Sequence, residues 1–135
     1  MDIRKTRDEM KTRKFEIMIK KVLIVDDEQE ICLLLSNILK SNGLKTYTAN
    51  SLSEANELLK DEPFDLAFLD LNLPDGVGFQ LIPVLKAHNK DIKCVIISAY
   101  NGISEKQRAK QEGADFFIGK PFNKNSILET VKLVS

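Results

Sequence analysis

The sequence predicts a single α/β domain, in which helices cover both faces of a parallel, five-stranded β-sheet. Its 135 residues are enough for one domain of ordinary size. After residue 18, short apolar runs alternate with segments of helical periodicity, which is typical of strands joined by helical crossovers. Most of these runs show no alternation of polar and apolar residues, as expected for strands buried on both faces of the sheet.

The first half of the domain contains two predicted strands and two predicted helices. Residues 22–25 form a buried strand, and residues 44–49 mix polar and apolar side chains, which predicts a half-exposed edge strand. Gly43 is placed to cap the helix between them, whose apolar stripe is Ile31, Leu34, Leu35, Ile38 and Leu39. Ser51 and Glu54 predict a capping box for the second helix, which would bury Ala55, Leu58 and Leu59.

The middle of the domain contains two more buried strands, at residues 64–69 and 94–97. The helix between them fits residues 79–88. Its Pro83 removes a backbone donor, so we expect a kink or a late start. The following helix, at about 103–111, is mostly polar and should be weakly anchored to the core.

The chain ends with a strand and a helix. Residues 116–118 predict the fifth strand. The last helix begins at Asn123 or Ser126 and has a stripe of apolar residues at helical spacing, namely Ile127, Leu128, Val131 and Val134.

Composition and charge exclude several classes of protein. The 20 basic and 20 acidic residues give zero formal net charge, which argues against nucleic acid as the partner. Residues 1–17 carry six basic and four acidic side chains, so we interpret them as a basic, flexible or marginally helical extension before a domain at 18–135. No apolar stretch suits a membrane span or a signal peptide, so we expect a cytoplasmic protein. Cys32 and Cys94 are expected to be reduced and packed.

Polar side chains occur where four of the five predicted strands end. They are Asp26 and Asp27, Asp70, Ser98 and Lys120. Parallel strands bring their carboxyl ends to one edge of the sheet, where open α/β sheets place their binding sites. Oxygen ligands without His or Cys favour a hard ion such as Mg²⁺, and a lysine beside them suits a transferred anion. Each Asp alone is more typical of a helix cap or a turn, but the five residues together predict phosphoryl chemistry with one aspartate as nucleophile.

Four segments together resemble the receiver domain of two-component response regulators, in particular the single-domain, chemotaxis-regulator-like members. They are KKVLIVDDE at 20–28, DLNLPDG at 70–76, IISAY at 96–100 and EGADFFIGKPF at 112–122. The resemblance covers residues 18–135 and implies a flavodoxin-like, doubly wound (βα)5 fold with strand order 2-1-3-4-5. It also implies a phosphoacceptor module rather than an enzyme, with Mg²⁺-dependent self-phosphorylation and autodephosphorylation as its only activities.

The resemblance assigns the acceptor and the metal ligands. Asp70 would accept a phosphoryl group from a phosphohistidine on a sensor histidine kinase or phosphotransfer protein. Asp26, Asp27 and Asp70 would hold Mg²⁺, Asp27 more directly than Asp26, together with the backbone carbonyl of Asn72. We interpret Asn72 and Tyr100 as residues that modulate phosphoryl lifetime, with Tyr100 shielding the site from water.

The resemblance also assigns a switch. Lys120 would contact the phosphoryl group, and its peptide bond to Pro121 would be cis. Ser98 would bond a phosphoryl oxygen and Phe117 would rotate inward, without the hydroxyl that a tyrosine would bring to that position. Ala99 is the small residue that leaves the acceptor approachable. The changed surface would be the fourth helix, fifth strand and fifth helix, which could also bind an unknown effector or form a homodimer.

Three alternatives stay open from the sequence alone. The chain could be a receiver domain excised from a larger response regulator or hybrid kinase. A small phosphatase of the haloacid dehalogenase type would use Asp26 and Glu28 as its paired acids, but it leaves Asp70 without a role. A flavin carrier shares the topology, yet no hydroxyl- and glycine-rich phosphate loop follows the first strand.

Overall fold

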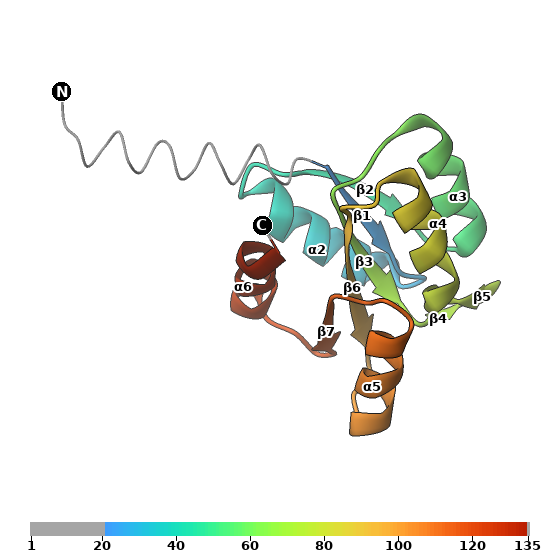
Figure 1. Ribbon diagram of the computed structural model, residues 1–135. Coiled ribbons are helices and arrows are strands. Elements are labelled where there is room, and N and C mark those ends of the chain that lie inside the picture. The colour runs from blue at the N-terminus through green and yellow to red at the C-terminus, as the bar shows by residue number, and fades with distance from the viewer. Residues whose placement is uncertain (1–20, 135) are drawn as a thin grey trace.

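The computed structural model describes residues 21–134, and the predicted extension at residues 1–17 lies outside the described part. Five parallel strands form the main sheet, in the order β2-β1-β3-β6-β7 (Figure 1). These strands are β1 (Lys21–Val25), β2 (Lys45–Ala49), β3 (Leu66–Asp70), β6 (Lys93–Ser98) and β7 (Phe116–Gly119). A separate two-stranded hairpin is formed by β4 (Asn72–Leu73) and β5 (Gly76–Val77). Strands β6 and β7 are therefore the fourth and fifth strands of the main sheet, and the predicted order 2-1-3-4-5 is confirmed.

Helices cover both faces of the sheet and create two separate hydrophobic cores. Helices α2 (Gln29–Lys40) and α6 (Lys124–Val134) pack against one face, where the core includes Phe68. The other face is covered by α3 (Leu52–Asp61), α4 (Leu81–His88) and α5 (Ile103–Gln111). Burial of the central strands β1, β3 and β6 on both sides explains why their sequences lack polar alternation.

The edge strand and the weakly anchored helix also agree with the sequence. Strand β2 is exposed or half-buried at every residue before Ala49. Helix α5 buries only Ala109, and Arg108 extends over the Phe79 ring with 5.5 Å between the guanidinium carbon and the ring centroid. Both cysteines are buried free thiols. None of the helices in residues 21–134 combines the length and apolar character needed to cross a bilayer.

The predicted apolar stripe of α2 is wrong at Leu34. This side chain is 46% exposed, whereas Cys32 and Ser36 are buried on the helix face that contacts the sheet. Residues 31–35 are all apolar, so more than one helical face fits their spacing, and packing decides between them. The helix ends as predicted before Gly43, which has a positive φ of 84°.

The starts of α3 and α4 refine two further predictions. Ser51 Oγ accepts a hydrogen bond from Glu54 N at 3.1 Å, but the Glu54 carboxylate accepts from Asn50 N, so only half of the predicted capping box forms. Pro83 is the third residue of α4, after a 3-10 turn at Gly78–Gln80. The expected late start is confirmed, because a proline in the first turn removes no intrahelical hydrogen bond.

Candidate functional site

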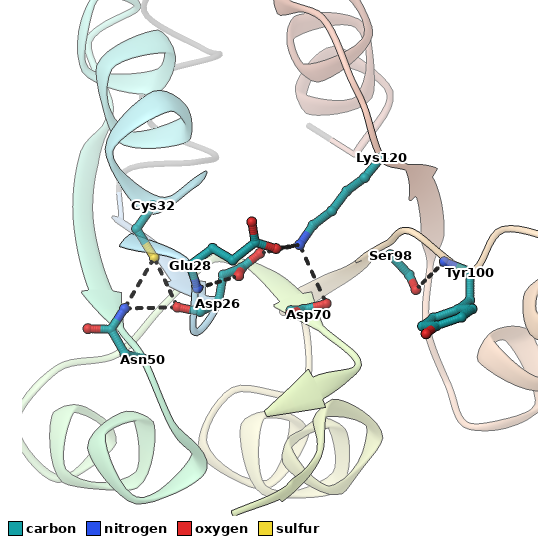
Figure 2. Close-up of polar contacts among 8 residues, drawn as sticks. All are labelled: Asp26, Glu28, Cys32, Asn50, Asp70, Ser98, Tyr100 and Lys120. Carbon is teal, nitrogen blue, oxygen red and sulfur yellow. Dashed lines mark hydrogen bonds and ion pairs between the residues drawn. The ribbon is translucent and has the colours of Figure 1, made fainter. Parts of the chain in front are cut away.

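The polar residues predicted at the strand ends come together at the carboxyl edge of the sheet (Figure 2). Asp26 follows β1, Asp70 ends β3 and Ser98 ends β6, and all three are buried. Asp27 lies beside them and is exposed. One carboxylate oxygen from each of Asp26, Asp27 and Asp70 lies within 4.8 Å of the others. Parallel registers align these ends, since Asp70 pairs with Ile97 and Ser98 pairs with Gly119, the residue before Lys120.

Lys120 reaches into the cluster from the end of β7 and bridges three carboxylates (Figure 2). Its Nζ lies 2.8 Å from Asp26 Oδ2, 3.2 Å from Glu28 Oε1 and 3.7 Å from Asp70 Oδ1. Burial by itself lowers the pKa of Lys120, but the bonds and charges of these carboxylates outweigh it and raise the pKa. The ammonium is therefore charged and lies closer to Asp26 than to Asp70.

Burial and mutual repulsion raise the pKa of the two buried carboxylates, Asp26 and Asp70. Burial, followed by the charge of Asp26, raises the pKa of Asp70 to about 6, although Lys120 opposes the shift. Burial also raises the pKa of Asp26, against the hydrogen bond from Lys120. Asp26 Oδ2 is buried and, apart from this ion pair, has no hydrogen-bond partner among residues 21–134. One lysine therefore leaves the negative charge of the site incompletely compensated.

The donor set fits a hard divalent cation. Asp26, Asp27 and Asp70 offer only oxygen ligands, which suit Mg²⁺ or Ca²⁺ better than softer metals. Cys32 lies nearby, but burial and the Asp26 charge raise its pKa to about 11. Its thiol thus stays protonated and donates to the Asp26 carbonyl oxygen at 3.3 Å, so it is not expected to bind the metal.

Two residues that support the site were not identified from the sequence. Asn50 follows the edge strand β2, and its Nδ2 donates to the Asp26 carbonyl oxygen at 2.8 Å. Glu28, considered above only for the phosphatase alternative, pairs with Lys120 and donates its backbone N–H to Asp26 Oδ1 at 2.9 Å. The position of Asn50 after a strand was the only available signal, and Glu28 was marked by its place beside the Asp pair.

The remaining predicted residues surround the cluster. Ser98 Oγ accepts a hydrogen bond from Tyr100 N at 3.0 Å, and the Tyr100 residue is 63% exposed. Phe117 is half-buried against the core beneath α3, α4 and α5. Asn72 in β4 and Ala99 after β6 are exposed. The Lys120–Pro121 peptide bond is cis.

Comparison with known proteins identifies the family. The family model of the response regulator receiver domain matches residues 22–132. The chain therefore belongs to the response regulator receiver domain family, which is a family of signalling modules rather than classical enzymes.

Relatives differ in how much of their length this chain covers. Response regulator protein PilR of Pseudomonas aeruginosa is 38% identical over 111 residues, which are 82% of this chain but 25% of PilR. Sporulation initiation phosphotransferase F of Bacillus subtilis is 31% identical over 86% of this chain and 94% of its own length. A response regulator protein from Burkholderia pseudomallei was crystallised with a phosphorylated aspartic acid, calcium ion and citrate. It superposes with a TM-score of 0.77 at 29% identity, over 83% of this chain and 66% of that one.

Proposed function

We propose that Asp70 is the phosphoacceptor of this receiver domain. The observation that carries the proposal is the position of Asp70: it ends a central strand, is only 5% exposed, and faces Lys120 and two further aspartates. The Burkholderia pseudomallei relative, which contains a phosphorylated aspartic acid, supports the same chemistry. The haloacid dehalogenase alternative is disfavoured, because Asp26 is engaged by Lys120 and Asp70 would have no role.

The donor would be a phosphohistidine on a sensor histidine kinase or phosphotransfer protein. An Asp70 carboxylate oxygen attacks phosphorus, a P–O bond forms, and the P–N bond to the histidine breaks. The electron pair of that bond leaves with the imidazole. Asp70 needs no general base once it is ionised, so the surrounding residues act by positioning and by neutralising charge.

Asp26, Asp27, Asp70 and the backbone carbonyl of Asn72 would hold Mg²⁺, which when bound neutralises the carboxylates and the incoming phosphoryl oxygens. The ammonium of Lys120 is already within 3.7 Å of Asp70 Oδ1. A phosphoryl group on Asp70 would attract it away from Asp26 and Glu28. Ser98, beside Lys120 on the neighbouring strand, would donate its hydroxyl to another phosphoryl oxygen.

Phosphorylation would then change the surface of α5, β7 and α6. Movement of Ser98 toward the phosphoryl group would open space for Phe117, and α5 would respond because it buries so little. The changed surface would bind a downstream effector or a second copy of the chain. Ala99 would keep the acceptor accessible, while Asn72 and Tyr100 would set phosphoryl lifetime.

The module would act in the cytoplasm, where sensor kinases present their phosphohistidines. It would show Mg²⁺-dependent self-phosphorylation and autodephosphorylation. The chain would serve either as a single-domain regulator or as the receiver part of a longer protein. Phosphotransferase F is matched over nearly its whole length, and PilR over a quarter, so the relatives include both arrangements.

Intact mass spectrometry after incubation with acetyl phosphate and Mg²⁺ tests the proposal. Wild-type protein should gain one phosphoryl group, and Asp70→Ala should gain none. Asp91→Ala, which changes an exposed carboxylate at the opposite end of the sheet, should behave as wild type. An adduct on Asp26 in place of Asp70, with rapid turnover of phosphate esters, would contradict the receiver function and favour the phosphatase.

A further inference from the structure

The β4–β5 hairpin follows Asp70 directly and is fastened to helix α3 by the side chain of Asp75. Asp75 Oδ1 accepts a hydrogen bond from Leu52 N at 2.8 Å, and Oδ2 accepts from Ser53 N at 3.0 Å. These two bonds hold the pKa of Asp75 below its ordinary value. Both carboxylate oxygens are thus committed to the start of a helix that lies more than 20 residues earlier in the chain.

Two side chains, Ser51 and Asp75, cap the start of α3. The first N–H groups of any helix lack intrahelical partners. In α3, Ser51 Oγ already accepts from Glu54 N at 3.1 Å, in the usual manner of a local cap. Asp75 satisfies the two preceding N–H groups and, unlike Ser51, connects the helix to another part of the fold. The connection to the hairpin is therefore the distinctive contribution of Asp75.

The hairpin has little room to move without disturbing Asp70. At Gly78, the residue directly after the hairpin, a Cβ would clash with the Asp70 carbonyl oxygen, so only glycine allows this close approach. A Cβ on Gly76 would lie 2.5 Å from Leu52 Cδ1. Gly78 N also donates to the Leu71 carbonyl oxygen at 2.9 Å. The hairpin thus lies tightly between the acceptor and α3, and a shift of its tip would be transmitted to the backbone beside Asp70.

We propose that Asp75 is a positioning residue that holds the hairpin backbone so that the Asn72 carbonyl is correctly placed to bind a divalent cation. The inference rests on the proposed function, in which that carbonyl is a metal ligand beside Asp70. A carbonyl ligand cannot be adjusted by a side-chain rotation, because its direction is set by the backbone alone. The attachment of the hairpin therefore determines where this ligand lies.

Three variants test the inference in the full chain. Asp75→Ala removes both bonds to α3, and Asp75→Asn keeps one acceptor oxygen should the alanine variant not fold. Ser51→Ala is the matched control, because it removes a hydrogen bond from the same helix end without affecting the hairpin attachment. Amide hydrogen exchange of residues 71–78 is measured without metal, and the dissociation constant of Mg²⁺ is measured by calorimetry.

We expect Asp75→Ala to accelerate exchange in residues 71–78 and to weaken Mg²⁺ binding about tenfold, as loss of a group that orients a metal ligand typically does. Asp75→Asn should fall between this variant and wild type. Ser51→Ala should leave both measurements at wild-type values. Equal weakening by Ser51→Ala and Asp75→Ala would reduce Asp75 to a helix cap and overturn the inference.

The two proposals fail in different ways. A wild-type protein that binds no Mg²⁺ would overturn the proposed function, and the metal ligand assigned to Asn72 with it. A wild type that binds Mg²⁺, with an Asp75→Ala variant that binds it equally well, would overturn only the role of Asp75.

Discussion

Replacement of Asp70 by asparagine should stabilise the metal-free protein at neutral and alkaline pH. The carboxylate of Asp70 is buried beside Asp26, and its pKa is raised from 3.8 to about 6. A raised pKa means that the folded state binds the proton more tightly than the unfolded state. The stabilisation that the protonated Asp70 carboxyl gives the folded state is complete below pH 3.8 and is lost as the pH rises through about 6. At pH 8 the ionised Asp70 therefore opposes folding, and the neutral amide of asparagine does not.

The size of the effect follows from the shift. One pKa unit corresponds to about 1.4 kcal/mol, so the penalty at pH 8 is at most about 3 kcal/mol. This penalty already includes the attraction between Lys120 and Asp70, because that attraction lowers the pKa of Asp70 and so reduces the net shift. We expect Asp70→Asn to raise the free energy of unfolding by about 1 to 3 kcal/mol at pH 8. The gain should shrink toward zero at pH 4, where the wild-type carboxyl is protonated in the folded protein.

Urea unfolding in EDTA at pH 4, 6 and 8 measures this dependence. Asp91→Asn is the control, since its exposed side chain lies far from the site. Addition of Mg²⁺ should stabilise the wild type by mass action and remove the advantage of the variant. Equal stability of Asp70→Asn and wild type at pH 8 would refute the reasoning. A gain that is the same at pH 4 would show that packing, and not charge, is responsible.

Three further predictions concern Lys120, Tyr100 and the response to phosphorylation. Lys120→Ala should lower the free energy of unfolding in EDTA at pH 8 by about 2 kcal/mol or more, because buried Asp26 loses the cation with which it is paired; unchanged urea unfolding would contradict this. Tyr100→Ala should accelerate loss of the phosphoryl group if the ring shields the site, and an unchanged decay rate followed by intact mass would show that it does not. Phosphorylation should change hydrogen exchange mainly in residues 98–119, whereas a uniform change, or none, would exclude the proposed switch.

The sequence predicted the sheet well because each strand follows a simple physical rule. Strands buried on both faces need continuous apolar runs, and the edge strand β2 needs mixed polarity, so both types were recognisable. Helix α2 was harder, because residues 31–35 are all apolar and their spacing alone does not determine which face is buried. Leu34 was placed inward for that reason, and contact with the sheet selected Cys32 instead.

The site was predictable as a set of residues but not as a set of contacts. Topology alone brings Asp26, Asp70, Ser98 and Lys120 to one edge, since each follows or ends a parallel strand. The partner that Lys120 selects depends on side-chain conformation and on the charge that is present. Lys120 Nζ lies 2.8 Å from Asp26 Oδ2, a buried oxygen that residues 21–134 give no hydrogen-bond partner apart from this ion pair. Asp75 was missed because no local pattern relates it to α3.

The pairing of Lys120 suggests why a signal would travel toward β7 and α5 and not toward α2. Lys120 N donates to the Ser98 carbonyl oxygen at 2.8 Å, so the two residues expected to contact a phosphoryl group share one hydrogen bond between neighbouring strands. An anion on Asp70 would act on both at once. On the side of β1, Asp26 is held by Asn50, Cys32 and the Glu28 backbone, which resist displacement. Helix α5, which connects β6 to β7, buries only Ala109, so its motion would cost little.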